Sequence, residues 1–254
     1  MASNCLLAAL PHQDQPDLAP YLEEVTLVRG QVLFEPGHVP SHVHFPHAGT
    51  MVSLVLPLRD GGTTETVTVG LEGAAGISVD ATDATVEAYT RAVVQMPGTA
   101  TRILTTDLAR AAAASPSLRH LLARYAEAAM SMALQTAACN AQHPLRPRLA
   151  RWLLTAQDRA DDAAAPVPLT QEFLAEMLSV RRASAGEAAL GLQAEELVRL
   201  SRAGVTVLDR ARLEGASCEC HGALRRRFAQ LLPDCLPQGA RGADAIAPAA
   251  DPAR

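Results

Sequence analysis

The residues with the clearest chemical potential are four polar side chains within one short segment, Arg181, Arg182, Ser184 and Glu187. An arginine guanidinium can pair with two acceptors on a guanine edge, and a glutamate can accept a hydrogen bond from a cytosine amino group. Serine and arginine also bind phosphate oxygens. This is the chemistry of recognition rather than catalysis. We predict that these side chains contact double-stranded DNA if a helix presents them together.

The residues around these four predict two short helices joined by a tight turn, in the stretch 170–185. Leu174 and Leu178 lie four positions apart and therefore share one face of the first helix, while Ala175 is small enough to let a second helix cross closely. Thr170 can cap the first helix through its hydroxyl. This is the spacing of a helix-turn-helix, although an ordinary helical hairpin with a basic end fits the same stretch.

Histidines and cysteines are the other candidate ligands. His42 and His44 would share one face of a strand, but no cysteine or carboxylate stands at ligand spacing beside them, so we expect surface histidines there and predict no metal site. Cys218 and Cys220 could grip a metal or sense oxidation, and we interpret them first as a structural feature.

Composition separates the chain into two unlike halves. The 254 residues are 48% hydrophobic with a net charge of −5, so the chain can bury a core and does not have the charge of a protein that coats nucleic acid. Residues 1–90 carry two arginines against eleven acidic residues (net −9), whereas residues 91–254 carry twenty against sixteen (net +4). Such a gradient fits an acidic sensor joined to a DNA reader.

The expected compartment is the cytoplasm. The five cysteines are odd in number and dispersed, which argues against a disulfide framework. The N-terminus lacks a basic leader, and no segment approaches the roughly 20 apolar residues of a membrane span, so we expect no membrane partner.

Short runs separated by Gly, Pro and Asp predict a small antiparallel barrel or sandwich in the first part of the chain, after one or two short helices within residues 1–24. The expected strands cover residues 25–28, 31–34, 43–45, 51–56, 65–69, 91–96 and 100–103.

Helices dominate the next part, over residues 107–114 and 116–142. In the longer helix, apolar positions recur at alternating spacings of four and three, which is a heptad seam. The seam could pack on the chain's own barrel, but a complete barrel leaves little core to cover, so we predict a homodimer. The predicted interface consists of Leu118, Leu122, Tyr125, Ala129, Met132, Thr136 and Cys139.

The remainder predicts a winged helix. A further helix is expected at about residues 148–159, followed by a polar loop and the helix pair of 170–185. Residues 197–200 and 205–208 then flank a turn containing Gly204, which predicts a hairpin. Residues 238–254 are rich in Ala, Pro and Gly and predict a disordered tail.

This order of elements resembles the Crp/Fnr superfamily of bacterial transcription regulators. The resemblance covers nearly the whole chain and is most specific over residues 135–140, 148–154, 169–182 and 205–214, which are similar to a subgroup common in alphaproteobacteria. It implies an α+β fold with a cyclic-nucleotide-binding-like sensor barrel (1–110), a dimerisation helix (111–143), a winged helix-turn-helix DNA-binding domain (144–237) and the tail (238–254).

The effector is left open by the resemblance. The founding members bind cyclic AMP through a Gly-Glu pair and an Arg followed by Ser or Thr, but here Gly73 is followed by Ala74, and Ala88 and Tyr89 stand at the later pair, with Arg91 three residues on. Cyclic AMP is therefore not the expected ligand. An iron-sulfur cluster is not expected either, because Cys5 is the sole N-terminal cysteine. Haem stays open through the histidines at positions 38, 42, 44, 47 and 120.

The resemblance implies a homodimer that places its second helices in successive major grooves of an imperfect palindrome, with RNA polymerase as a candidate partner. Thr170, Gln171, Arg202 and Arg210 would contact phosphates. No nucleophile, base and orienting group recur at informative spacing, so we do not expect an enzyme. The alternative is a small-molecule or metal sensor in which DNA binding is secondary.

Overall fold

The computed structural model describes residues 4–10, 18–59, 62–162 and 164–235, so the predicted tail at 238–254 lies outside the described residues. All seven predicted strands are confirmed, each to within two residues at either end. Two short helices precede or border them, α1 (Cys5–Ala8) and η1 (Ala19–Tyr21). The strands are β1 (Glu23–Leu27), β2 (Val32–Phe34), β3 (His42–Pro46), β4 (Met51–Pro57), β5 (Thr63–Val69), β6 (Arg91–Met96) and β7 (Gly98–Leu104).

Hydrogen bonds arrange these strands in two antiparallel sheets. One has the order β1-β7-β3 and the other the order β2-β6-β4-β5. Alternate side chains enter a shared core, in which Val43, Phe45, Val52, Val94 and Ile103 are at most 1% exposed. The predicted antiparallel domain is therefore present, and we refer to its two sheets together as the sandwich.

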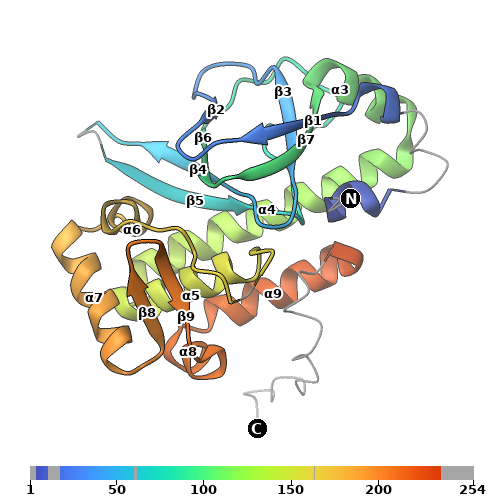
Figure 1. Cartoon of the computed structure of the whole chain (residues 1–254). Helices are drawn as coiled ribbons and strands as arrows, with labels where there is room; N and C mark the ends of the chain where they lie inside the picture. Colours follow the sequence, from blue (N-terminus) through green and yellow to red (C-terminus); the bar gives the residue numbers. More distant parts are fainter. Residues whose placement is uncertain (1–3, 11–17, 60–61, 163, 236–254) are drawn as a thin grey trace, which may run out of the picture.

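Two helices follow the sheets as predicted, α3 (Thr105–Ala114) and α4 (Pro116–Gln142). Ser115 caps α4, because its Oγ accepts a hydrogen bond from the Leu118 N–H at 3.0 Å, and Pro116 occupies the first turn, where its missing N–H costs nothing. Figure 1 shows α4 passing beneath the sheets toward the C-terminal part. No helix in the described ranges is long and apolar enough to cross a membrane.

The predicted seam of α4 lies inside the chain. Tyr125 donates its hydroxyl hydrogen to the Ala74 carbonyl (2.9 Å), and Met132 Sδ accepts from the Thr68 N–H (3.2 Å). Six of the seven seam side chains are buried within one chain, and Ala129 is half-buried. The chain's own sheets and last helix already cover these side chains. The prediction that they form a dimer interface is therefore wrong for this set: Leu118, Leu122, Tyr125, Ala129, Met132, Thr136 and Cys139.

A second stripe of α4 faces outward. Met130 and Leu134 are 54% and 65% exposed. They belong to a heptad repeat of exposed positions whose acidic member, Glu127, forms an ion pair with Arg227. The apolar members of this outer stripe are Ala123, Met130, Leu134, Ala137 and Ala141.

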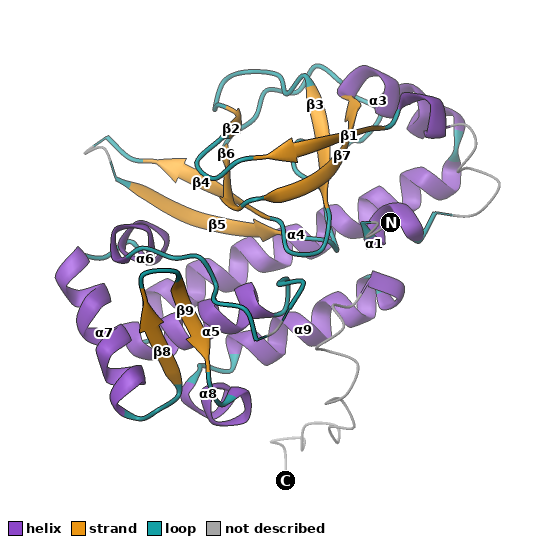
Figure 2. Ribbon diagram, in the orientation of Figure 1, coloured by secondary structure: helices purple, strands orange, loops and turns teal. Residues whose placement is uncertain are grey.

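The C-terminal part contains the predicted helix pair and hairpin. The helices are α5 (Leu145–Gln157), α6 (Gln171–Leu178) and α7 (Arg182–Ala194), and the hairpin strands are β8 (Val198–Ser201) and β9 (Gly204–Val207). Figure 2 shows the hairpin lying beside α7, which is the arrangement of a winged helix-turn-helix. Gly204 has a φ of +136° and passes so close to Val167 that a Cβ would lie 2.0 Å from its carbonyl oxygen, so only glycine fits at this corner.

Three further elements complete the chain: α8 (Arg210–Ala216), α9 (Cys220–Leu231) and η2 (Pro233–Cys235). The sequence prediction assigned no element to the α9 region. This helix lies alongside α4 in both ribbon views (Figures 1 and 2) and buries Leu224, Phe228 and Leu231 in the same core as the sheets. The C-terminal helix therefore connects the part that holds the helix pair and the hairpin to the part that holds the two sheets.

Candidate nucleic-acid interface

The helix pair has the predicted local geometry. Thr170 Oγ1 accepts a hydrogen bond from the Phe173 N–H at 3.1 Å and so caps α6. Leu174 and Leu178 are each 2% exposed and Ala175 is 8% exposed, so one face of α6 packs against the neighbouring helices. Gln171 opens α6, and its side chain lies outside what the structure describes.

Ser179 forms the turn between the two helices in a left-handed conformation, with φ 52° and ψ 50°. Its backbone N–H and that of Val180 return to α6, the latter donating to the Ala175 carbonyl at 2.9 Å. A residue other than glycine is strained in the left-handed conformation, so Ser179 lowers the stability of the folded chain relative to a glycine at this turn. The Ser179 hydroxyl compensates in part through a 2.7 Å hydrogen bond to Thr64 Oγ1.

α7 presents the predicted reading residues on its outer face. Arg182 and Glu187 are exposed on that face, and Ser184 is half-buried in the first turn. Arg181, also exposed, is the residue that precedes the helix. The opposite face buries Ala185, Ala189 and Leu192. The inner face of α7 is therefore held by packing in the core, and its charged outer face is exposed, where a DNA major groove could receive it.

Two exposed side chains near this face were absent from the sequence prediction. Leu190 lies seven positions after Ala183 on the same side of α7 and is 55% exposed. An apolar side chain at such a place can contact a thymine methyl group. Arg199 is exposed on β8, and Arg202 is exposed at the hairpin tip, as predicted. Helical period and strand alternation were the signals that could have identified Leu190 and Arg199.

Arg210 is engaged within the chain. Its guanidinium donates to Asp158 (2.6 Å), Gln157 (3.0 Å) and Glu214 (3.0 Å), so it holds α8 against the end of α5. Burial opposes the charge of Asp158, but hydrogen bonds from His221 and Arg210 outweigh it and lower the carboxyl pKa. The predicted phosphate contact of Arg210 is corrected to an internal ion pair.

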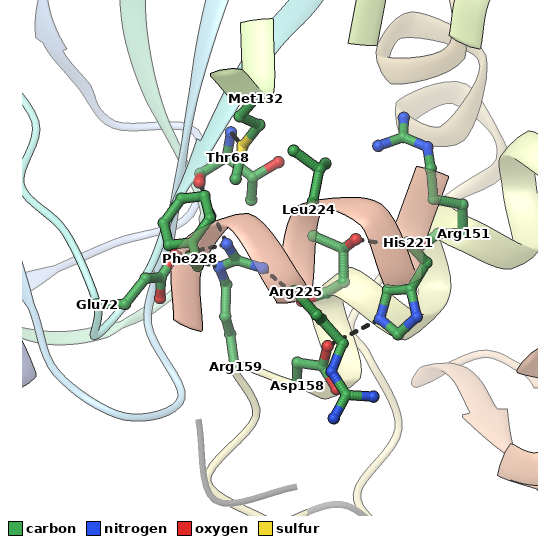
Figure 3. Close-up of a pocket in the computed structure, with 11 residues that line it drawn as sticks. Thr68, Glu72, Met132, Arg151, Asp158, Arg159, His221, Leu224, Arg225 and Phe228 are labelled. Atoms are coloured by element: carbon green, nitrogen blue, oxygen red, sulfur yellow. Dashed lines mark hydrogen bonds and ion pairs between the residues drawn. The ribbon is translucent and has the colours of Figure 1, made fainter. Parts of the chain in front are cut away.

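Buried polar contacts join the helix-turn-helix part to the N-terminal sheets. Arg159, just after α5, forms an ion pair with Glu72, and the two side chains are 7% and 3% exposed. Figure 3 shows this pair and the Asp158–His221 pair (2.9 Å) along one small pocket of about 50 Å³. Because a buried charge without its partner is costly, these contacts hold the two parts in a defined arrangement.

A cavity of about 500 Å³ lies between the sandwich and α4. Its lining is mostly apolar and includes Ala88 and Tyr89, the positions of the missing cyclic-nucleotide pair. Asp83 and Glu87 are its charged members, and no described lining residue is basic. Arg91 instead pairs with Glu35 at 2.8 Å. The cavity therefore lacks the cation that a buried phosphate requires.

The expectation of surface histidines between positions 38 and 47 is wrong for His44 and His47, which are buried. His47 bonds through its two ring nitrogens to Thr99 and Thr101 (2.9 and 2.8 Å). His44 is buried, and desolvation followed by the charges of His42 and Arg102 lowers its pKa to about 4. His38 lies near the Pro36 carbonyl. The cysteines behave differently, since Cys218 and Cys220 lie beside Cys139 and His143.

Comparison with known proteins identifies the DNA-binding part and the fold. Residues 147–216 match the model of a Crp-like helix-turn-helix domain. No curated protein matches the chain in sequence.

Solved structures match over most of the chain. A CRP-family transcriptional regulator from Thermus thermophilus is 20% identical, with 77% of this chain and 99% of that chain covered and a TM-score of 0.62. FixK2 from Bradyrhizobium japonicum is 13% identical, with 78% and 98% covered and a TM-score of 0.66. The c-di-GMP responsive global regulator CLP from Xanthomonas campestris is 14% identical, with 78% and 100% covered and a TM-score of 0.59. At these identities the match establishes the fold.

Proposed function

We propose that this chain, which has the fold of Crp/Fnr regulators and a Crp-like helix-turn-helix domain, is a homodimeric transcriptional regulator that reads a pseudo-palindromic operator. In this role it is a cytoplasmic DNA-binding protein rather than an enzyme. The observation that carries the proposal is the outer face of α7, where Arg182 and Glu187 are exposed next to Arg181, the residue before the helix, while the inner face packs in the core.

The side chains of α7 contact the DNA bases, and the residues around α7 contact the DNA phosphate backbone. Arg182 and Glu187 supply a donor pair and an acceptor for base edges. Arg199 and Arg202 on the wing and Thr170 at the start of α6 supply phosphate contacts, which fix the register of the helix in the groove. Arg210 takes no part, because its guanidinium is held inside the chain by Glu214, Gln157 and Asp158.

Dimerisation uses the outer stripe of α4 rather than the seam predicted from sequence. A heptad stripe of exposed alanines with Met130 and Leu134 can pack against its own copy, since small residues let two helices approach closely. Two-fold symmetry then places the two α7 helices in grooves about 34 Å apart on one face of the duplex.

The cavity between the sandwich and α4 is the proposed effector site. Its apolar lining and its acidic Asp83 and Glu87 favour an uncharged or cationic, largely apolar small molecule over a cyclic nucleotide. Met130 and Ala126 of α4 also line it, so an occupant would contact the helix of the outer stripe directly. Mass spectrometry of small molecules retained by the native protein tests this assignment.

A gel shift of the purified protein on its own upstream DNA tests the function. We expect binding at low salt that weakens as salt rises, because phosphate contacts release counterions. The double variant R181A/R182A should lose the shift, whereas R110A, which removes an exposed arginine on the sensor helix α3, should retain it. Absence of binding at low salt would reject the proposal in favour of a sensor module that does not read DNA.

A further inference from the structure

Four metal-ligating side chains converge where α4 ends and α9 begins. Cys139 and His143 lie four residues apart at the end of α4, and Cys218 and Cys220 precede and open α9. Their ligating atoms all lie within 4.8 Å of one another. The three cysteines are buried and His143 is half-buried, so the cluster is shielded from bulk water. None of these residues has a role in the DNA-binding face or the effector cavity described above.

The spacings within the cluster match a tetrahedral ion. Two sulfurs each about 2.3 Å from a tetrahedral zinc are about 3.8 Å apart, and a sulfur and an imidazole nitrogen are about 3.5 Å apart. Here Cys139 Sγ and Cys218 Sγ are 3.5 Å apart, and Cys220 Sγ and His143 Nδ1 are also 3.5 Å apart. The protein therefore holds these ligands at nearly the separations that a bound ion needs.

The surroundings orient the ligands as in known metal centres. His143 turns Nδ1 toward Cys220, and its Nε2 lies 3.2 Å from a carboxylate oxygen of Glu219. A carboxylate on the far nitrogen of a ligating histidine fixes its tautomer and makes it a better ligand. Gln135 Nε2 donates to Cys220 Sγ at 3.0 Å, a contact that stabilises a thiolate. Both partners fit a ligand set more than a plain packing cluster.

We propose that Cys139, His143, Cys218 and Cys220 bind one zinc ion as a closed, structural Cys₃His site. Three thiolates and a neutral imidazole are the ligand types that zinc prefers, and four protein ligands leave no open position for catalysis. On binding, the three thiols release their protons to solvent and no electrons are transferred. A cubane iron-sulfur cluster is a poorer fit because the set has three thiolates instead of four.

The ion would join two segments that are 79 residues apart in sequence, the end of the long helix and the start of α9. The DNA-binding helices lie between these two attachment points along the chain. Zinc would therefore fix the angle at which the DNA-binding part leaves α4. This inference stands apart from the proposed function, since metal binding can be measured without DNA.

Metal analysis of the full-length protein, purified under reducing conditions without chelators, is the direct test. We expect about one zinc per chain, and we expect cobalt(II) exchanged into the site to show the thiolate charge-transfer and tetrahedral absorption bands of a sulfur-rich site. Zinc-free protein whose cobalt(II) complex lacks thiolate bands would overturn the proposal. A disulfide between Cys139 and Cys218 found by mass spectrometry in freshly reduced, metal-supplemented protein would overturn it as well.

Substitutions of the proposed ligands test where the zinc ion binds. C220S and H143A should each lower the retained zinc and weaken the cobalt(II) spectrum, whereas C5S, which alters a cysteine remote from the cluster, should leave both unchanged. Because C220S can also unfold the chain, circular dichroism accompanies each titration. A folded C220S that keeps stoichiometric zinc and an unchanged spectrum would exclude Cys220 from the site and contradict the ligand set.

Discussion

The indole N–H of Trp152 donates a hydrogen bond to Oε2 of Glu65 across 2.7 Å. Trp152 belongs to α5 of the helix-turn-helix part and Glu65 to β5 of the N-terminal sheets. Glu65 also accepts from the Ser53 hydroxyl and is buried. Desolvation raises the Glu65 pKa, while these hydrogen bonds act in the opposite direction. The contact therefore connects the two parts through a buried carboxylate whose charge is stabilised by the hydrogen bonds that it accepts.

Removing the indole donor should destabilise the folded chain. We expect W152F to lower the free energy of unfolding by about 1–3 kcal/mol, because a buried acceptor is left short of a partner. The loss should shrink as the pH falls and Glu65 takes up a proton. Urea unfolding followed by circular dichroism measures it. In an E65Q background the same change should cost less, and equal costs in the two backgrounds would show that the hydrogen bond is not the cause.

His44 should make the protein sensitive to acid. Its folded pKa of about 4 lies below the usual 6.5, so the unfolded chain binds the proton more tightly and stability falls as the pH drops from about 6.5 to 4. H44Q, which does not titrate, should lack this part of the loss. The difference should reach on the order of 3 kcal/mol at the acid end, measured by urea unfolding across this range. Parallel pH profiles for both proteins would contradict the burial of a neutral His44.

Ser179 tests the strain in the helix-turn-helix. S179G and S179A both lose the hydroxyl bond to Thr64, but only glycine relieves the left-handed backbone. S179G should therefore be more stable than S179A by about 1 kcal/mol. Thermal or urea unfolding of the pair isolates the backbone effect from the lost hydrogen bond. A stability difference of zero would mean that the turn adopts another conformation in solution.

The proposed dimer contact through the outer stripe of α4 predicts how substitutions change the oligomeric state. L134D should dissociate the protein into folded monomers in sedimentation velocity, because a charge would be placed in an apolar helix contact. L208D changes another exposed leucine, 45% exposed in the DNA-binding part, and should remain dimeric. L122D should instead unfold the chain, since Leu122 is 2% exposed within one protomer. A dimeric L134D would exclude the stripe as the interface.

Local patterns predicted most of the fold. Strands such as β4 and β6 were identified because turn residues bound them closely, and the αL turn at Ser179 lies where the helix spacing breaks. The period of α4 could not show which of its two heptad stripes faces the chain's own core, so Leu122 was assigned outward and Leu134 was overlooked. The missed helix α9 carries apolar residues at helical spacing, and its triple arginine obscured them.

Some residues of the candidate site could be predicted from the sequence and others could not. Arg182 could be assigned from its place at a helix start, since that depends on neighbours in sequence. The engagement of Arg210 by Asp158 and the meeting of Cys139 with Cys218 depend on contacts between distant segments, which spacing does not encode. His221 is adjacent to Cys220 in sequence but bonds to Asp158, whereas His143 lies beside the cysteines, so adjacency along the chain does not predict which histidine joins them.

Selection of bound sequences from a randomised duplex library tests sequence-specific reading by a dimer most directly. A dimer that reads DNA sequence should enrich an inverted repeat whose half-sites are centred about one helical turn apart. With R182A, one position in each half-site should relax and affinity should fall by about 1–3 kcal/mol, with R110A unchanged as control. Enrichment of no sequence, or of an unrepeated one that R182A binds equally well, would contradict sequence-specific reading by a dimer.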